Sequence, residues 1–495
     1  MKFYVTTPLY YINAEPHIGH TYTTIAADTL ARFYRMSGAD VFFLTGTDEH
    51  GQKIAEAAKK QGTTPAELAD KNSGIYRRLW KDMDISYTRF IRTTEQIHTE
   101  MVQKVFGKLL ENGDLYRGEY SGFYCVPCES YLVPEDESNP LCPDCGRPMS
   151  RISEPSYFFR ISKYADRLQK YIETHDFVKP DFRKNEVLNF IKSGLNDVSI
   201  TRKNVEWGIA SPTPEKYTVY VWFDALLNYL SGVGYLHDEN QFNTYWPADV
   251  QLIGKDIIRF HDVIWPGILM ALDLPLPEKI FAHGWWISGK DKISKSKGNA
   301  VSPQKLIAEY GIDAFRFFVL REIPFGMDGE YSDETFKKRY NSDLVNDLGN
   351  LVNRTVNLVE TKLSGTVNSA PLEGQLAELT GSVQKNCSEK IRSLAFSEAL
   401  EEIWSLVSFL NKYLDEKAPW REGCGDVNGV LHNVVHGIRD AALMLAPFIP
   451  STSLKIWNIL GLEGNPCEKS LASAGEKLPD RLKTNKREIL FPRKK

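Results

Sequence analysis

Apolar and polar residues alternate along the first fifty positions in a pattern that predicts a strand, a helix and a second strand. Residues 2–7 are mostly aromatic or β-branched and fit a buried strand. Residues 21–36 repeat apolar side chains at helical spacing, and residues 40–46 form another apolar run. Such a unit is right-handed and parallel, and ligands bind at the carboxyl ends of its strands, beside the helix N-terminus.

Two later apolar runs extend this pattern, and each leads into an acidic residue. Residues 217–223 predict a strand that ends at Asp224, and residues 251–254 predict a strand followed by Asp256. A carboxylate in this position commonly accepts from ribose hydroxyls, and we assign that role to Asp256. The segment between Tyr116 and Pro214 therefore interrupts one parallel sheet.

From Ser332 onward the hydrophobic period becomes helical. One apolar stripe runs from Leu344 to Val359, a second from Leu400 to Leu414, and a third over residues 430–445. Pro447 and Pro450 follow the third stripe and predict its end. The C-terminal third is thus expected to be a helix bundle.

Charge and composition limit the partners and the location. The chain has 495 residues, a 42% hydrophobic share typical of soluble globular proteins, and a net charge of −4. A nucleic acid would therefore be held by local basic patches, such as residues 337–339 or 481–495, although either could be a solvated face. We find no signal peptide and no apolar run of about 18 residues, so we expect a cytoplasmic protein without a membrane span.

Four of the seven cysteines form two C-x2-C hooks, Cys125 with Cys128 and Cys142 with Cys145. Two such hooks separated by a short polar loop predict a tetrahedral zinc site. Four thiolates leave no open position on the metal, so the predicted Zn²⁺ is structural. The alternative is two disulfides, which the reducing cytosol disfavours.

Two short motifs contain the candidate catalytic residues. His17-Ile18-Gly19-His20 places two histidines on one face at the positive end of a helix, and Lys292-Ile293-Ser294-Lys295-Ser296 is a Lys-Ser-rich loop able to close over a triphosphate. In this order they resemble the two signatures of class I aminoacyl-tRNA synthetases, with Ile293 where that family usually has Met.

The resemblance sharpens to the methionyl-tRNA synthetase family and runs essentially end to end. It rests on residues 8–11, 221–225, Tyr229 and the run from Phe260 to Trp265. It implies a methionine pocket formed by Leu9, Tyr11, Asp48, Trp222, Ala225, Tyr229, Phe260, His261 and Trp265. Aromatic edges favour the thioether sulfur, Tyr229 and His261 could sense it, and Asp48 can pair with the substrate ammonium. Arg202 also matches a family position, but we assign it no role.

The same resemblance implies the remaining machinery. His17, His20, Lys292 and Lys295 would be catalytic, and ATP with Mg²⁺ would also contact Gly19, Gly254 and Asp256. On the first C-terminal helix, amide and guanidinium groups suit the reading of unpaired base edges. Asn350 and Arg354 match the family's anticodon-reading pair and Trp420 its stacking tryptophan, so the expected partner is tRNA(Met) with a CAU anticodon. The family's optional C-terminal dimerisation module is not found before Lys495, so we expect a monomer.

The predicted fold is α/β: a Rossmann-like parallel-sheet catalytic domain split by a zinc-bearing insertion, then an α-helical bundle that binds the anticodon. We expect catalytic halves at residues 1–115 and 217–275, a connective insertion at 116–216, a linking segment with the Lys-Ser loop at 276–335, and the bundle at 336–495. The two steps would be formation of methionyl-adenylate and transfer to tRNA.

Two alternatives remain open. One is another adenylating enzyme of this class. Large synthetases for branched-chain amino acids need a far longer insertion. The synthetase for cysteine needs a zinc-binding cysteine in the loop before the first motif, and residues 6–16 contain no cysteine. The other is a non-catalytic zinc and RNA-binding factor, which does not require the histidine pair and the loop lysines together.

Overall fold

The computed structural model describes residues 1–13, 15–126, 128–131, 137–143, 145–288, 291–292, 301–485 and 488–494. They divide into two units. The sheet unit contains Lys2–Pro16 and Phe42–His283, and the helical unit contains Met1, His17–Val41 and Gly284–Lys495.

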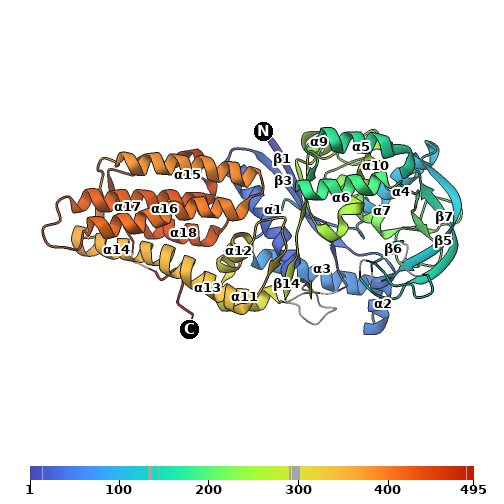
Figure 1. The fold of residues 1–495 in the computed structure, drawn as a ribbon, viewed down its shortest axis with the longest axis horizontal. Coiled ribbons are helices and arrows are strands. Elements are labelled where there is room, and N and C mark those ends of the chain that lie inside the picture. The colour runs from blue at the N-terminus through green and yellow to red at the C-terminus, as the bar shows by residue number, and fades with distance from the viewer. Residues whose placement is uncertain are drawn as a thin grey trace. The chain divides into compact units, whose positions relative to one another are not determined.

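A seven-stranded sheet organises the sheet unit (Figure 1). Its strands run parallel in five of their pairings: β1 with β12, β12 with β13, β13 with β8, β2 with β3 and β3 with β4. The strand order is β2 (Tyr10–Tyr11), β3 (Asp40–Asp48), β1 (Lys2–Thr6), β12 (Val250–Gly254), β13 (Ile280–His283) and β8 (Val178–Lys179), with β4 (Arg89–Arg92) beside β3. The strands predicted near residues 2–7, 40–46 and 251–254 are confirmed, as is the Rossmann-like fold class.

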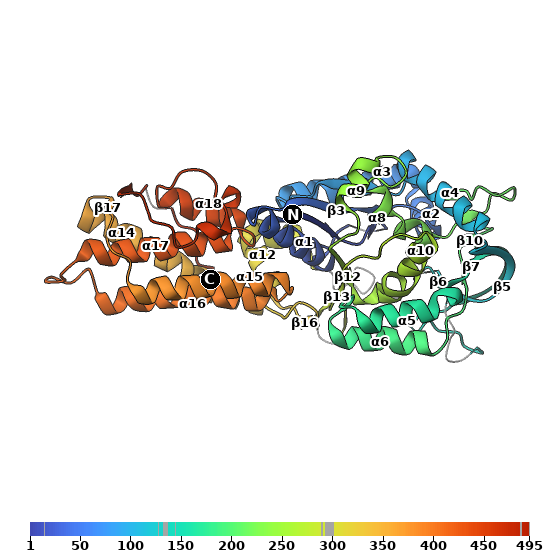
Figure 2. The same ribbon diagram turned by 90° about the horizontal axis from the view of Figure 1, so that it is seen from above.

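One large apolar core covers this sheet. Figure 2 shows two of the helices that supply it, α5 (Ala165–Thr174) and α6 (Asp181–Lys192), side by side. The others include α4 (Gln96–Glu111), α8 (Asn228–Ser231) and α10 (Trp265–Ala271), with a π-helical turn over Phe260–Ile264 leading into α10. Single-turn π segments often occur at functional sites, and this one carries two predicted pocket residues.

The strand predicted over residues 217–223 is wrong for most of its length. Only Thr218–Val219 forms a strand, β11, and α7 (Val221–Leu226) begins two residues later. The β-branched and aromatic run favours a strand locally, but such preferences are weak and tertiary contacts override them. Here the helix buries Asp224 against two histidines, a set of contacts that no local pattern encodes.

The insertion is built on a long antiparallel hairpin. Strands β5 (Leu115–Cys125) and β7 (Ser150–Phe159) pair from Leu115 to Tyr124, and β6 (Ser130–Tyr131) and β9 (Val198–Ser199) flank them. A separate pair joins β10 (Thr201–Arg202) to β11. The first cysteine hook begins where β5 ends, so the hairpin carries the cysteines at its far end.

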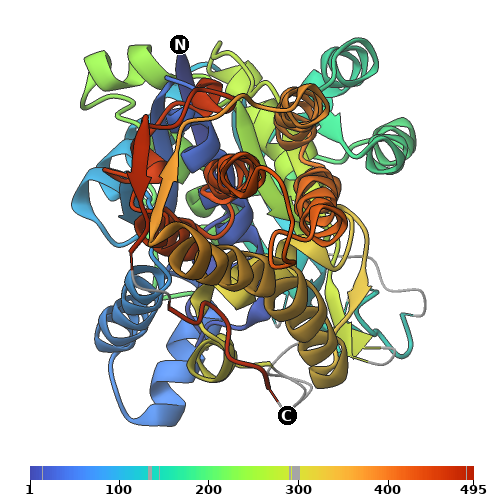
Figure 3. The same cartoon turned by 90° about the vertical axis from the view of Figure 1, so that its left-hand side faces the viewer.

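The C-terminal bundle of the helical unit is confirmed. Figure 3 looks along several of its helices, and the apolar stripe from Leu400 to Leu414 is buried. The bundle contains α14 (Asn350–Leu363), α15 (Gly374–Arg392), α16 (Phe396–Lys417), α17 (Val427–Leu445) and α18 (Pro450–Ile459). A π-helical stretch, Tyr340–Gly349, leads directly into α14.

A buried ion pair ties the first helix to this bundle within the same unit. Helix α1 (Ile18–Met36) contributes Asp28, and α12 (Ile312–Arg321) contributes Arg316, whose Nη2 lies 2.7 Å from the Asp28 carboxylate. Arg316 also donates to the carbonyl oxygens of Pro447 and Phe448, at 3.1 Å and 2.7 Å. Both charged side chains are fully buried, so the pair fixes α1 against the turn between α17 and α18.

Among the described residues, every helix is too short or too polar to cross a bilayer.

Candidate active site

The two motif histidines stand at the N-terminus of α1, as the spacing predicts. His17 is the N-cap, and its imidazole lies 3.8 Å from that of His20 with the rings nearly parallel. The Gly19 N–H donates to His17 Nδ1 at 3.1 Å, and the His17 N–H donates to His20 Nδ1 at 3.2 Å. Because both Nδ1 atoms accept, the neutral rings carry their hydrogen on Nε2. A Cβ at position 19 would lie 3.0 Å from the His17 ring, so glycine allows this packing.

The second motif is described only at its start. The backbone of Lys292 belongs to β15 (Asp291–Lys292), which pairs with β14 (Trp286–Ser288). Lys295 and the rest of the predicted loop lie outside the described residues.

The predicted ribose-binding rim follows β12 in the sheet unit. Gly254 ends this strand, and Asp256 lies in the single turn of 3-10 helix after it. A Cβ at Gly254 would come within 2.6 Å of the Asp256 carboxylate. Glycine therefore lets the backbone pass close to this carboxylate at the carboxyl end of the strand.

Most of the predicted pocket aromatics of the sheet unit come together. Trp222 on α7 stacks on Phe260 with ring centroids 3.8 Å apart and planes only 7° apart. Tyr229 lies 5.6 Å from Trp265, which is fully buried and donates to Gln251 Oε1. Tyr11 and Trp222 each pack against a small cluster of Tyr124, Tyr220 and Val221. Leu9 packs against the large core, and Ala225 is buried. We call this aromatic cluster the slot, after the methionine pocket that the sequence predicts for these residues.

Tyr229 and His261 form a polar end to this slot. The hydroxyl lies 2.8 Å from His261 Nε2, and His261 Nδ1 lies 3.1 Å from the carbonyl oxygen of Ile257. A carbonyl can only accept, so Nδ1 carries the hydrogen and Nε2 accepts from Tyr229. Burial lowers the pKa of His261 to about 4, which keeps the ring neutral near pH 7.

Asp48 is a buried carboxylate that lacks a full set of donors. It ends β3, and its Oδ1 has no hydrogen-bond partner among the described residues. Burial raises the pKa of Asp48 well above its usual value, and the charges of Asp224 and Glu129 raise it further, although the His50 N–H opposes them. Such a group lowers its free energy by pairing with a cation.

A buried network behind the slot was not predicted. The Asp224 carboxylate lies 2.7 Å from His50 Nδ1 and 2.7 Å from His98 Nε2, and His98 Nδ1 lies 2.7 Å from Ser231 Oγ. Burial alone would raise the pKa of Asp224, but the two histidines lower it below its ordinary value. The network links α7 to the segment that follows Asp48. No sequence signal connects these positions.

Glu129 was also missed, and it connects the cysteine hairpin with the slot. This buried residue follows Cys128 directly, accepts from the Lys53 N–H at 3.2 Å and bonds to the Tyr11 hydroxyl. The single hydrogen of that hydroxyl is shared between Glu129 and the carbonyl oxygen of His50, which lies 2.9 Å away. An acidic residue beside a cysteine hook was the only available signal, and it is weak.

The four hook cysteines converge as predicted. Their sulfur atoms all lie within 4.8 Å of one another. Cys125 and Cys145 are 3.6 Å apart, and Cys128 and Cys142 are 3.8 Å apart, far longer than a disulfide bond. A tetrahedron with metal–sulfur bonds of about 2.3 Å has edges of about 3.8 Å. The donor set and its size therefore fit one tetrahedral metal ion.

In the helical unit, two of the three predicted anticodon residues meet. The Arg354 guanidinium lies over the Trp420 ring at 5.4 Å and pairs with Asp415 at 2.6 Å. Trp420 is 39% exposed, which is unusual for so large an apolar ring, and Asn350 is exposed one turn before Arg354 on α14. Arg202, in the sheet unit, pairs with Glu154 at 2.6 Å and lies over Tyr124 at 4.1 Å.

The sequence matches two known families. The family tRNA synthetases class I (M) matches residues 3–154 and 139–356, and the anticodon-binding domain of tRNA ligase matches residues 376–489. Asn350 and Arg354 fall near the end of the first match and Trp420 within the second.

Individual relatives are similar over nearly the whole chain. Methionine–tRNA ligase of Caldanaerobacter subterraneus subsp. tengcongensis is 49% identical over 99% of this chain and 78% of the relative. That of Thermotoga maritima is 45% identical over 96% and 78%. Mycobacterium tuberculosis methionyl-tRNA synthetase in complex with methionyl-adenylate superposes with a TM-score of 0.95 at 40% identity, covering 100% of both chains. Its free-state crystal structure gives 0.88 at 37% identity, over 100% of this chain and 99% of that one.

Proposed function

This chain belongs to the methionyl-tRNA synthetases of class I, and from that premise we propose how its residues carry out the reaction. The enzyme joins L-methionine to tRNA(Met) in two steps. The methionine carboxylate first attacks the α-phosphorus of ATP, the bond to the β-phosphate oxygen breaks, and pyrophosphate leaves. A terminal ribose hydroxyl of the tRNA then attacks the carbonyl carbon of methionyl-adenylate and AMP leaves.

The buried Asp48 carboxylate is the observation that carries the proposed substrate site. Its unsatisfied Oδ1 is an acceptor, and the α-ammonium of methionine is a donor of opposite charge. The aromatic slot receives the side chain. Trp222, Phe260 and Trp265 supply faces and edges against which a polarizable sulfur packs favourably, at ~0.3–1.5 kcal/mol for each such contact. Leu9, Tyr11 and Ala225 complete the apolar wall.

Asp224 is a positioning residue in this scheme. It holds His50, which follows Asp48, and it lies on the same helix as Trp222 and Ala225. Its ionised carboxylate also adds negative potential near the ammonium site, because its charge is felt by Asp48. Asp224 thereby fixes the ammonium site and one wall of the slot relative to each other.

The nucleotide is held mainly through its phosphates. The Nε2–H groups of His17 and His20 donate to phosphate oxygens at the positive end of α1, and Gly19 keeps the backbone close. Lys292 and Lys295 neutralise the departing pyrophosphate, while Gly254 and Asp256 take the ribose. Mg²⁺ bound with ATP supplies further charge neutralisation on the triphosphate. Little covalent chemistry falls to the protein, so catalysis is positioning and electrostatic stabilisation.

We assign Zn²⁺ to the four cysteine thiolates. Since these fill a tetrahedron, the ion is structural and takes no part in the reaction. The bound ion would order the end of the β5–β7 hairpin through Cys125, Cys128, Cys142 and Cys145. Glu129, next to Cys128, bonds to the Tyr11 hydroxyl and so connects this hairpin end with the slot.

The helical bundle reads the anticodon in this proposal. The exposed Trp420 ring offers a stacking surface, and Arg354 and Asn350 offer donors and acceptors to base edges of a CAU anticodon. The proposed division is a catalytic domain at residues 1–115 and 217–275, a connective insertion at 116–216, a linking segment at 276–335 and the anticodon domain at 336–495. We further propose that the enzyme acts as a monomer in the cytoplasm.

ATP–pyrophosphate exchange with each of the twenty amino acids tests this proposal. Methionine should support exchange far above every other amino acid, and Asp48→Asn should raise the KM for methionine. Exchange that is strongest with another amino acid, or absent with all of them, would overturn the assignment of the slot.

A further inference from the structure

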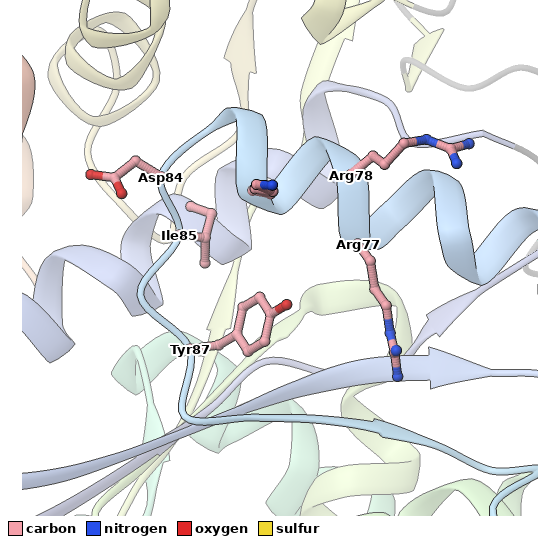
Figure 4. Close-up of a pocket in the computed structure, with 6 residues that line it drawn as sticks. Arg77, Arg78, Asp84, Ile85 and Tyr87 are labelled. Carbon is pink, nitrogen blue, oxygen red and sulfur yellow. The ribbon is translucent and has the colours of Figure 1, made fainter.

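Helix α3 and the segment after it form a surface hollow that the reaction described above does not use. The hollow has a volume of about 380 Å³ and is lined by Arg77, Arg78, Lys81, Asp84, Ile85 and Tyr87. Helix α3 (Pro65–Asp82) supplies the three cations from its last two turns. Figure 4 shows Arg77 and Arg78 leaving the helix in different directions, with Ile85 and Tyr87 across from Arg77.

These three cations have no acidic partner among the residues that the structure describes. Arg77, Arg78 and Lys81 are exposed and make no ion pair and no side-chain hydrogen bond there. Nearby, Arg89 pairs with Glu95, and Arg92 pairs with Glu49 and Asp70. A cation in the last helical turn is favoured by the helix dipole, which accounts for Lys81 but not for the two arginines before it.

One of the arginines is held in place by an aromatic ring. The Arg77 guanidinium lies over Phe90 at 4.7 Å, and Phe90 is itself buried against Tyr87 at 5.9 Å. Stacking restricts the plane of the guanidinium while its N–H groups stay available, and a planar fork of donors matches phosphate oxygens. The Tyr87 hydroxyl can exchange hydrogen bonds with sugar hydroxyls.

We propose that this hollow binds the sugar–phosphate backbone of the tRNA. The chain carries a net charge of −4, so a polyanionic partner must be attracted by local groups of unpaired cations. Cations that spread along a helix suit successive phosphates better than one enclosed anion. Phosphate contacts orient a nucleic acid without reading its sequence, so this surface contributes affinity and not identity.

The inference rests on the proposed function only in taking tRNA as the partner. The test compares wild type with Arg77→Gln/Arg78→Gln/Lys81→Gln and measures tRNA affinity from about 50 to about 200 mM salt. Each lost phosphate contact reduces the slope of log affinity against log salt by roughly 0.7–0.9. Three contacts therefore predict that wild type loses roughly 15- to 45-fold more affinity over this range than the variant does.

Matched variants separate a specific surface from a general charge effect. Lys104→Gln/Lys108→Gln/Lys170→Gln removes the same charge from exposed lysines on α4 and α5 and should keep the wild-type slope. The variant Arg77→Lys/Arg78→Lys keeps the positive charge and should keep most of the wild-type salt slope. The triple glutamine variant should bind a transcript with an altered anticodon more weakly than wild type does, by the same factor as for the CAU transcript. Methionine-dependent ATP–pyrophosphate exchange should stay unchanged in all variants.

The proposal is overturned if the triple glutamine variant keeps the wild-type slope, or if the α4–α5 control loses as much. It is also overturned if the loss is confined to one anticodon sequence. Failure of the proposed function looks different, because wild type itself would then form no methionyl-adenylate or charge no tRNA.

Discussion

Replacing Tyr229 by phenylalanine removes the hydroxyl that donates to His261 Nε2 at 2.8 Å. Tyr229 is 1% exposed and His261 3% exposed, so water has little room to replace the lost donor. A buried acceptor left without a partner costs about 1–3 kcal/mol. We therefore expect Tyr229→Phe to lower the free energy of unfolding by about that amount.

Tyr229→Phe should also reduce the preference of the enzyme for methionine over norleucine. The Tyr229–His261 pair is the polar end of an otherwise apolar cluster of rings, and a thioether tolerates a polar neighbour better than an alkyl chain does. Norleucine replaces the sulfur with a methylene and is otherwise similar in shape. If the hydroxyl contributes about 1 kcal/mol to the preference for sulfur, the ratio of kcat/KM for methionine over norleucine should fall about fivefold.

Tyr4→Phe is the matched control. Tyr4 is also fully buried, but its hydroxyl donates to the backbone carbonyl oxygen of Tyr229 at 2.9 Å, whereas the partner of His261 Nε2 is the Tyr229 hydroxyl. Both variants should show lower unfolding free energies in denaturant titrations, and only Tyr229→Phe should change the ratio measured by ATP–pyrophosphate exchange. If Tyr229→Phe is destabilised and keeps the wild-type ratio, the pair is structural and our account of selectivity fails.

Four further outcomes follow from the site. Trp420→Ala should weaken charging of a CAU transcript by a stacking loss of ~1–3 kcal/mol and should flatten the kinetic ratio between CAU and altered anticodons; an unchanged ratio would contradict the reading role. Lys295→Ala should lower the rate of adenylate formation much more than methionine affinity, measured by single-turnover kinetics, because its charge acts on the transition state; a loss seen wholly in affinity would argue against it. Cys128→Ser should lose the one zinc per chain found by elemental analysis in wild type, and metal-free wild type with stoichiometric disulfides would refute the site. Because burial raises the pKa of Asp48, acidification protonates it at a higher pH than an ordinary aspartate, so the KM for methionine should rise as pH falls there, and Asp48→Asn should remove that dependence.

The sequence alone determined the features that are local in the chain. The strand–helix–strand start, the apolar stripes of the bundle and the two cysteine hooks each repeat at a spacing that a single element or turn imposes. The histidine pair is of the same kind, since i, i+3 spacing at a helix start brings His17 and His20 together whatever surrounds them. Local backbone geometry suffices to place such residues.

Only the tertiary structure decided the contacts between distant segments. Asp224 meets His50 and His98, which lie 174 and 126 positions earlier, and this buried network turns a run with strand propensity into a helix. Glu129 reaches Tyr11 in the same way, and the pairing of Tyr229 with His261 fixes which nitrogen carries the hydrogen. The need to satisfy buried polar groups decides these arrangements, and that need arises only when remote parts of the chain exclude water together.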